Sequence, residues 1–138
     1  MLGKIQRRLL EALVAGEILP GAGGPLWFPD LSFVLRHPAV ALLSDNLAED
    51  FSVEQLHRPV RIVSLATLER EARTEGDIAY FRFRPAETEG DLIRLTLEAG
   101  IVPRDPALHP LGLGGIQIRF RRAGDEWVVA EEPTYFAI

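Results

Sequence analysis

Several residue types and motifs are missing from this chain, and each absence excludes a class of protein. The 138 residues include no cysteine, so disulfide frameworks, thiolate nucleophiles and cysteine-type zinc sites are excluded. The most apolar region, Phe33 to Leu43, is interrupted by Arg36 and Pro38, and no run approaches the roughly 20 apolar residues of a membrane-spanning helix. The N-terminal apolar stretch is interrupted by Glu11 and therefore differs from a secretory signal peptide. We expect a cytoplasmic protein that does not bind a membrane.

The motifs of common catalytic sites are also missing. The glycine-rich segment Leu19 to Pro25 has neither the G-K-[ST] ending nor the G-x-G-x-x-G spacing of a phosphate-binding loop. No G-x-S-x-G sequence is present to supply an acyl-transfer nucleophile. The histidines stand at positions 37, 57 and 109, too far apart for a metal-ligand motif, and only His109, in a long connection, is kept as a site candidate. We therefore expect no catalytic residue, no metal site and no cofactor, and we favour a protein that is not an enzyme.

A net positive charge is missing as well. The chain has fifteen lysine and arginine residues and twenty acidic ones, which gives a net charge of −5. Proteins that bind nucleic acid concentrate positive charge on one surface. We therefore expect no nucleic-acid partner.

The second half of the chain alternates strictly between apolar and polar residues, which is the pattern of half-buried β-strands. The alternation runs over residues 78–84, 91–99 and 115–122, and a turn at 123–126 precedes a fourth strand that begins at Trp127. Pro133 breaks the pattern, which predicts a bulge or a sheet edge there, and residues 135–138 resume it. The apolar positions of the three alternating strands predict one buried sheet face, formed by Phe81, Phe83, Ile93, Leu95, Leu97, Ile116, Ile118 and Phe120.

The first half of the chain must supply the elements that cover this face. Leu2 to Ala15 has apolar residues at helical spacing and is followed by a glycine that can end the helix. Val40 to Leu43 fits either a buried strand or a short helix, and we favour the strand. Arg58 to Val63 predicts a further strand, and Ser64 is a candidate N-cap for a helix over Leu65 to Glu75.

These elements predict a single α+β domain over residues 1–138. Residues 1–57 would form a helix and an irregular covering segment, and residues 58–138 a strand, a helix and an antiparallel sheet. We expect the N-terminal helix and the second helix to pack on one face of a four- to six-stranded, mainly antiparallel sheet.

Two groups of residues are candidates for ligand binding. Arginines gather on the polar face of the predicted sheet, where they could either hold a carboxylate or phosphate through bidentate contacts or form cross-strand ion pairs. The second group would line a pocket between the sheet and the N-terminal segment, gated by the long connection that contains His109. The candidates are Arg82, Arg94 and Arg119 in the first group, and Trp27, Tyr80 and His109 in the second.

One hairpin near the end of the chain resembles a known family. Residues 120–129 combine a turn, Ala123-Gly124-Asp125-Glu126, with a strand that Trp127 leads. This arrangement is similar to the last hairpin of nuclear-transport-factor-like domains, which belong to the cystatin-like superfold. The resemblance covers roughly residues 60–138 and implies helices that precede a curved antiparallel sheet. It supplies no catalytic Asp/His pair for this chain, and the superfold hosts enzymes, binders and assembly modules alike.

The absence of catalytic motifs, together with a sheet of a kind that often dimerises, favours a non-enzymatic protein-interaction or self-association module. The expected partner is a second copy of the chain or another protein, and the arginine face adds a small anionic ligand. The alternative is a small-molecule-binding protein or enzyme with a pocket between the sheet and the N-terminal segment.

Overall fold

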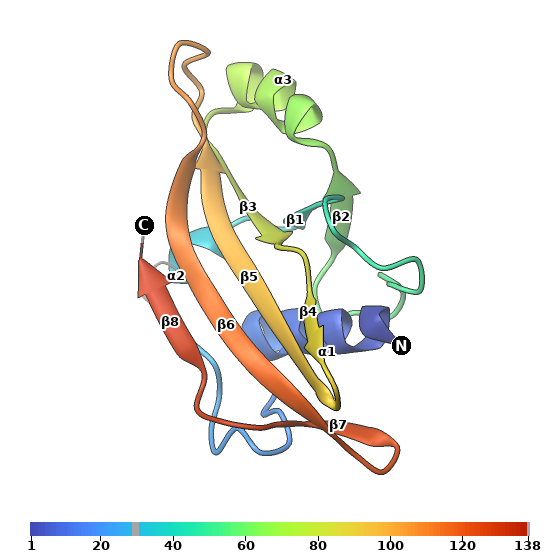
Figure 1. Cartoon of the computed structure of the whole chain (residues 1–138). Coiled ribbons are helices and arrows are strands. Elements are labelled where there is room, and N and C mark those ends of the chain that lie inside the picture. The colour runs from blue at the N-terminus through green and yellow to red at the C-terminus, as the bar shows by residue number, and fades with distance from the viewer. Residues whose placement is uncertain (29–30, 138) are drawn as a thin grey trace.

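The computed structural model describes residues 1–28 and 31–137 and shows an α+β domain with three helices and eight strands in that part of the chain (Figure 1). The α+β class predicted from the sequence is confirmed. The elements are α1 (Leu2–Ala15), α2 (Leu31–Val34), β1 (Val40–Leu43), β2 (Val60–Val63), α3 (Leu65–Glu75), β3 (Ile78–Phe83), β4 (Glu87–Glu89), β5 (Leu92–Val102), β6 (Leu111–Ala123), β7 (Glu126–Val129) and β8 (Thr134–Ala137).

The eight strands form one open, mixed sheet. The sheet thus has more strands than the predicted four to six, and it includes a parallel part that the prediction of a mainly antiparallel sheet missed. The main order is β2-β1-β3-β5-β6-β7, with β4 pairing to β5 and β8 to β6. β1 lies between β2 and β3 and is parallel to both. β2 and β3 thus need a crossover connection, and α3 provides it. The remaining ladders are antiparallel.

The long hairpin of β5 and β6 forms the centre of the sheet and curves over its full length (Figure 1). The predicted strands at 91–99 and 115–122 are present but extend further, to Val102 and from Leu111, so the connection between them is shorter than expected. A register shift between Ala99 and Gly100 marks an irregularity in this extension. The strand expected over residues 135–138 is β8, and Ile138 lies outside the described residues.

The predicted apolar face is confirmed as the main core. All eight of its residues are buried, and the apolar side of α1 packs against them together with Leu19, Leu26 and Phe28 of the following segment. α1 has the predicted bounds, and it ends at Gly16, whose φ of 72° is left-handed backbone that favours glycine. Gln6 links α1 to the segment that follows β1, because its side chain donates a hydrogen bond to Asn46 O and accepts one from Ala48 N.

α3 packs on the opposite face of the sheet from α1, which corrects the prediction that both helices share one face. Leu68 and Ala72 of α3 form a second, smaller core with Tyr80 and its neighbours, separate from the main core. β1 contributes to both cores, because Val40 and Leu42 point to one and Ala41 and Leu43 to the other. Burial on both faces explains why the β1 sequence is a continuous apolar run instead of an alternating one.

The local signals around α3 are confirmed. The Ser64 hydroxyl accepts a hydrogen bond from Thr67 N at 3.1 Å and caps the helix.

Among the described residues, no helix combines the length and the apolar character required to span a membrane.

Candidate functional site

The polar face of the sheet carries the predicted arginine cluster, and the structure pairs its guanidinium groups with carboxylates. Four arginines in or beside β3, β5 and β6 make ion pairs with glutamates of neighbouring segments. Because each of these guanidinium groups already engages a glutamate, a bound anion would compete with that glutamate. The pairs are Arg82–Glu98, Arg84–Glu98, Arg94–Glu87 and Arg119–Glu131.

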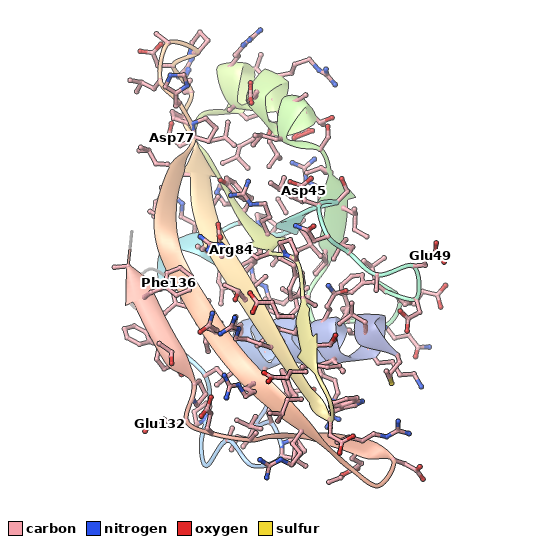
Figure 2. All side chains as sticks on the ribbon, viewed as in Figure 1. Asp45, Glu49, Asp77, Arg84, Glu132 and Phe136 are labelled. Atoms are coloured by element: carbon pink, nitrogen blue, oxygen red, sulfur yellow. The ribbon has the colours of Figure 1, made fainter. Side chains whose placement is uncertain are left out.

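Glu98 is the centre of one part of this surface. Its side chain is only 8% exposed although it points away from the main core. Arg82 Nη2 donates to Glu98 Oε2 at 3.2 Å, and Arg84 Nε donates to Glu98 Oε1. The Arg84 guanidinium also lies 6.0 Å from the centre of the Phe136 ring, on the same side of the sheet (Figure 2). These ion pairs link β3 and the residue that follows it to β5, and the Phe136 ring of β8 lies beside them.

Arg94 and Arg119 stand directly opposite each other on β5 and β6. Like charges in this position repel, and Glu87 and Glu131 relieve the repulsion, the latter at 3.4 Å from Arg119 Nη1. A shallow pocket of about 210 Å³ between β4 and the two arginines is lined by both of them and by Glu87 and Glu89. The structure therefore brings these two candidates together, whereas Arg82 belongs to the Glu98 network.

The other three candidates lie in three separate places. Trp27 is 57% exposed, and its backbone N–H donates to the Tyr135 hydroxyl at 3.5 Å. Tyr80 is buried in the small core under α3, where desolvation raises the pKa of its hydroxyl. His109 lies in the connection between β5 and β6 and lines a pocket of about 120 Å³ against α3.

The space between the sheet and the N-terminal segment is occupied by side chains of the main core. Phe28 is 2% exposed and packs edge-on against Phe81, with 6.5 Å between the ring centres. Leu19 and Leu26 fill the same layer. This packing leaves Trp27 outside the core instead of over a cavity.

A mainly apolar surface feature lies where β5 passes into β6, next to the C-terminal end of α3. We call it the hairpin patch. Leu108 and Leu111 are each 58% exposed there, beside a groove of about 740 Å³. The sequence predicted a candidate site in this connection because of His109 but did not identify the leucines. No local sequence pattern predicts that these leucines are exposed. The hairpin patch consists of Ile101, Pro103, Pro106, Leu108 and Leu111.

Hydrogen bonds fix the shape of this connection. Asp77, labelled near the end of the sheet in Figure 2, accepts from Arg104 N through Oδ1 at 2.7 Å. Asp105 Oδ1 accepts from Ala107 N at 2.9 Å, and Leu108 N donates to Asp105 O at 3.1 Å. These hydrogen bonds restrict the conformations of the connection before any partner binds. Binding would therefore cost less conformational entropy than it would for a flexible loop.

The sequence predicts no role for His57, and the structure brings it to two carboxylates. Its Nδ1 lies 2.5 Å from Glu11 Oε2 and 3.5 Å from Glu17 Oε1. The hydrogen bond to Glu11 and the negative charge of Glu11 raise the pKa of His57, with a smaller contribution from Glu17 and against partial desolvation. No sequence signal connects position 57 with α1, since the two are joined only by the fold.

Fold and surface together define an α+β domain with a filled core, a charge-paired sheet face and one pre-shaped apolar patch. No protein-family model, curated protein or solved structure matches this chain.

Proposed function

We propose that the protein is a non-enzymatic self-association module that dimerises through the hairpin patch. The observation that supports this is a pair of exposed leucines, Leu108 on a hydrogen-bonded turn and Leu111 at the start of β6, beside a mainly apolar groove. Soluble monomers rarely keep large apolar side chains together at the surface unless that surface binds something. The small size of the patch predicts a weak dimer that exchanges with monomer.

The charges around the patch favour a second copy of the chain as the occupant. A two-fold interface brings the same surface together from both subunits, so the surface must complement itself. The groove is also lined by two arginines and two aspartates, so that opposite charges can meet across a two-fold axis. A chain of net charge −5 repels its copy over most of its surface, and a charge-balanced apolar patch is where that repulsion is least. These four residues are Arg73, Arg104, Asp77 and Asp105.

Light scattering coupled to size exclusion, over a range of micromolar concentrations, tests this proposal. The wild-type protein is expected to shift from monomer to dimer as its concentration rises. Leu108→Asp should shift that transition to at least about tenfold higher concentration, because a buried unpaired charge in the interface costs more than 1.4 kcal/mol. Ile18→Asp is the matched control, because Ile18 is 63% exposed and lies outside the patch.

A wild-type protein that stays monomeric across the whole range would overturn the proposal. A dimer that Leu108→Asp leaves unchanged would place self-association on another surface and would equally reject the hairpin patch. A cytoplasmic location and a small anionic ligand on the arginine face stay predictions from the sequence.

A further inference from the structure

A cluster of side chains that can bind a metal ion lies away from the hairpin patch. It combines Glu11 in the third turn of α1, Glu17 just after the helix ends at Gly16, and His57 in the connection that leads to β2. One ligand atom from each residue lies within 4.8 Å of those of the other two. The fold thus collects an imidazole nitrogen and two carboxylate oxygens at one point.

Glu11 is the unusual member of this cluster. It lies on the polar side of α1, the side of Lys4 and Arg7, and is nevertheless only 6% exposed, because the connection that contains His57 folds over it. A buried carboxylate needs a partner of positive charge. Within the described residues, no lysine or arginine makes an ion pair with Glu11 or Glu17, and His57 is their only ion-pair partner. Even with a charged imidazole, the three side chains together carry a net negative charge.

The geometry and the donor types fit a divalent metal ion. Zn²⁺ binds imidazole nitrogen and carboxylate oxygen at about 2.0–2.2 Å, which places neighbouring ligand atoms roughly 3–3.5 Å apart. The distance from His57 Nδ1 to Glu17 Oε1 is 3.5 Å, and that from Nδ1 to Glu11 Oε2 is 2.5 Å. The side chains of His57 and Glu17 are 60% and 49% exposed, so small rotations can open the shorter distance.

We propose that Glu11, Glu17 and His57 form a binding site for a divalent transition metal, with Zn²⁺ as the preferred ion. Three protein ligands leave a coordination position that faces solvent, as in zinc sites that bind a water molecule or a further ligand. This proposal departs from the sequence-based expectation of no metal site. Bound metal would join the connection before β2 to the end of α1 and would stabilise the folded chain by mass action.

Isothermal titration of the purified protein with Zn²⁺ tests the site. One Zn²⁺ per chain is expected in the wild type. Glu17→Gln is the decisive variant, because Glu17 is half-exposed and its change leaves the core intact. Its affinity should fall at least about tenfold, since loss of even an outer partner of a metal ligand costs 10–100-fold.

Two further variants separate this site from others. His57→Ala should abolish the binding, and its circular dichroism spectrum shows whether it still folds. His109→Ala is the matched control, because it removes an exposed histidine from the β5–β6 connection and should leave Zn²⁺ affinity unchanged. The absorption spectrum of Co²⁺ in place of Zn²⁺ gives a second readout, since its intensity reports the coordination geometry.

Three results would overturn the proposal. The first is a wild-type protein that binds no Zn²⁺ in the titration. The second is equal affinity in the wild type and Glu17→Gln, which would leave the cluster as a His57–Glu11 ion pair. The third is a loss of binding in His109→Ala, which would place the metal in the β5–β6 connection.

Discussion

The two faces of the central sheet use the same strands in opposite ways, and consecutive residues of β5 show the contrast. Leu95 and Leu97 point into the main core and are completely buried. Thr96 and Glu98 point to the other side and are also buried, but among arginines, Gln117 and the Phe136 ring instead of apolar side chains. One face is held together by exclusion of water, and the other by paired charges and a small core under α3.

The apolar face is filled, and the paired arginines of the polar face already engage glutamates, so a ligand on either face would compete with contacts within the fold. The features that carry the two proposals lie at the ends of elements instead, in the hairpin patch and at the C-terminal end of α1. Four variants, two in the apolar cores and two in ion pairs, should differ in their effect on the free energy of unfolding.

Leu97→Ala should have the largest effect. It removes a completely buried side chain from the main core, and truncation of such a leucine costs about 2–5 kcal/mol. Urea unfolding followed by circular dichroism measures the change. Ile18→Ala, in an exposed position outside the hairpin patch, should stay within about 0.5 kcal/mol of the wild type. Equal effects of the two variants would contradict the assignment of the main core.

Leu68→Ala should have the next largest effect, about 2–3 kcal/mol, at the lower end of the range for buried leucine. Leu68 is fully buried, but the core under α3 contains few residues and borders solvent, so it can collapse more easily around the gap. Hydrogen exchange should show faster opening of α3 than of β5 in this variant. Arg70→Ala, on the exposed side of α3, is the control. Uniform destabilisation of both elements would indicate that the two cores unfold as one.

The sequence predicted what local patterns determine. Alternation in the later strands places Phe81, Leu97 and Phe120 on one face in advance, because a strand exposes successive residues to opposite sides. The bounds of α1 and α3 follow from helical spacing, the Ser64 cap and the glycines that end them. These signals lie within a few residues of the structure that they determine.

What the sequence left open depends on contacts between distant segments. The four residues of β1 do not specify that β1 inserts between β2 and β3, and that insertion adds the parallel part of the sheet. The face chosen by α3 follows from this crossover and not from its own sequence. The Glu11–His57 contact joins residues 46 positions apart, and burial of Glu11 depends on the connection that folds over it. The hairpin patch likewise results from exposure, which a list of apolar residues cannot supply.

Glu98→Gln tests the charged side of the comparison. The substitution keeps the shape of the side chain but removes the charge that two arginines share. We expect a loss of about 1–2 kcal/mol, below the full value for a buried charged pair, because Arg82 and Arg84 are 35% and 57% exposed and can regain water. Glu89→Gln, in an exposed position of β4, should have no measurable effect in the same urea titration. A neutral Glu98→Gln would mean that the arginines hold this face together without the carboxylate.

Glu71→Gln should have the smallest effect and the clearest dependence on pH. Arg61 on β2 holds Glu71 of α3 through two hydrogen bonds, and these lower the pKa of the Glu71 carboxyl below its usual 4.5. A lowered pKa means that the unfolded chain binds the proton more readily, so the pair stabilises the fold at neutral pH and loses this effect as pH falls below 4.5. Both side chains are about one-third exposed, so we expect at most about 1 kcal/mol at pH 7. Unfolding of the wild type and Glu71→Gln should therefore differ at pH 7 and converge in acid, once the pH has fallen below the lowered pKa of Glu71. A difference that persists in acid would show that the Glu71 side chain acts through packing or neutral hydrogen bonds. In that case charge would not be what stabilises this contact, and the polar face would be stabilised by packing, as the apolar face is.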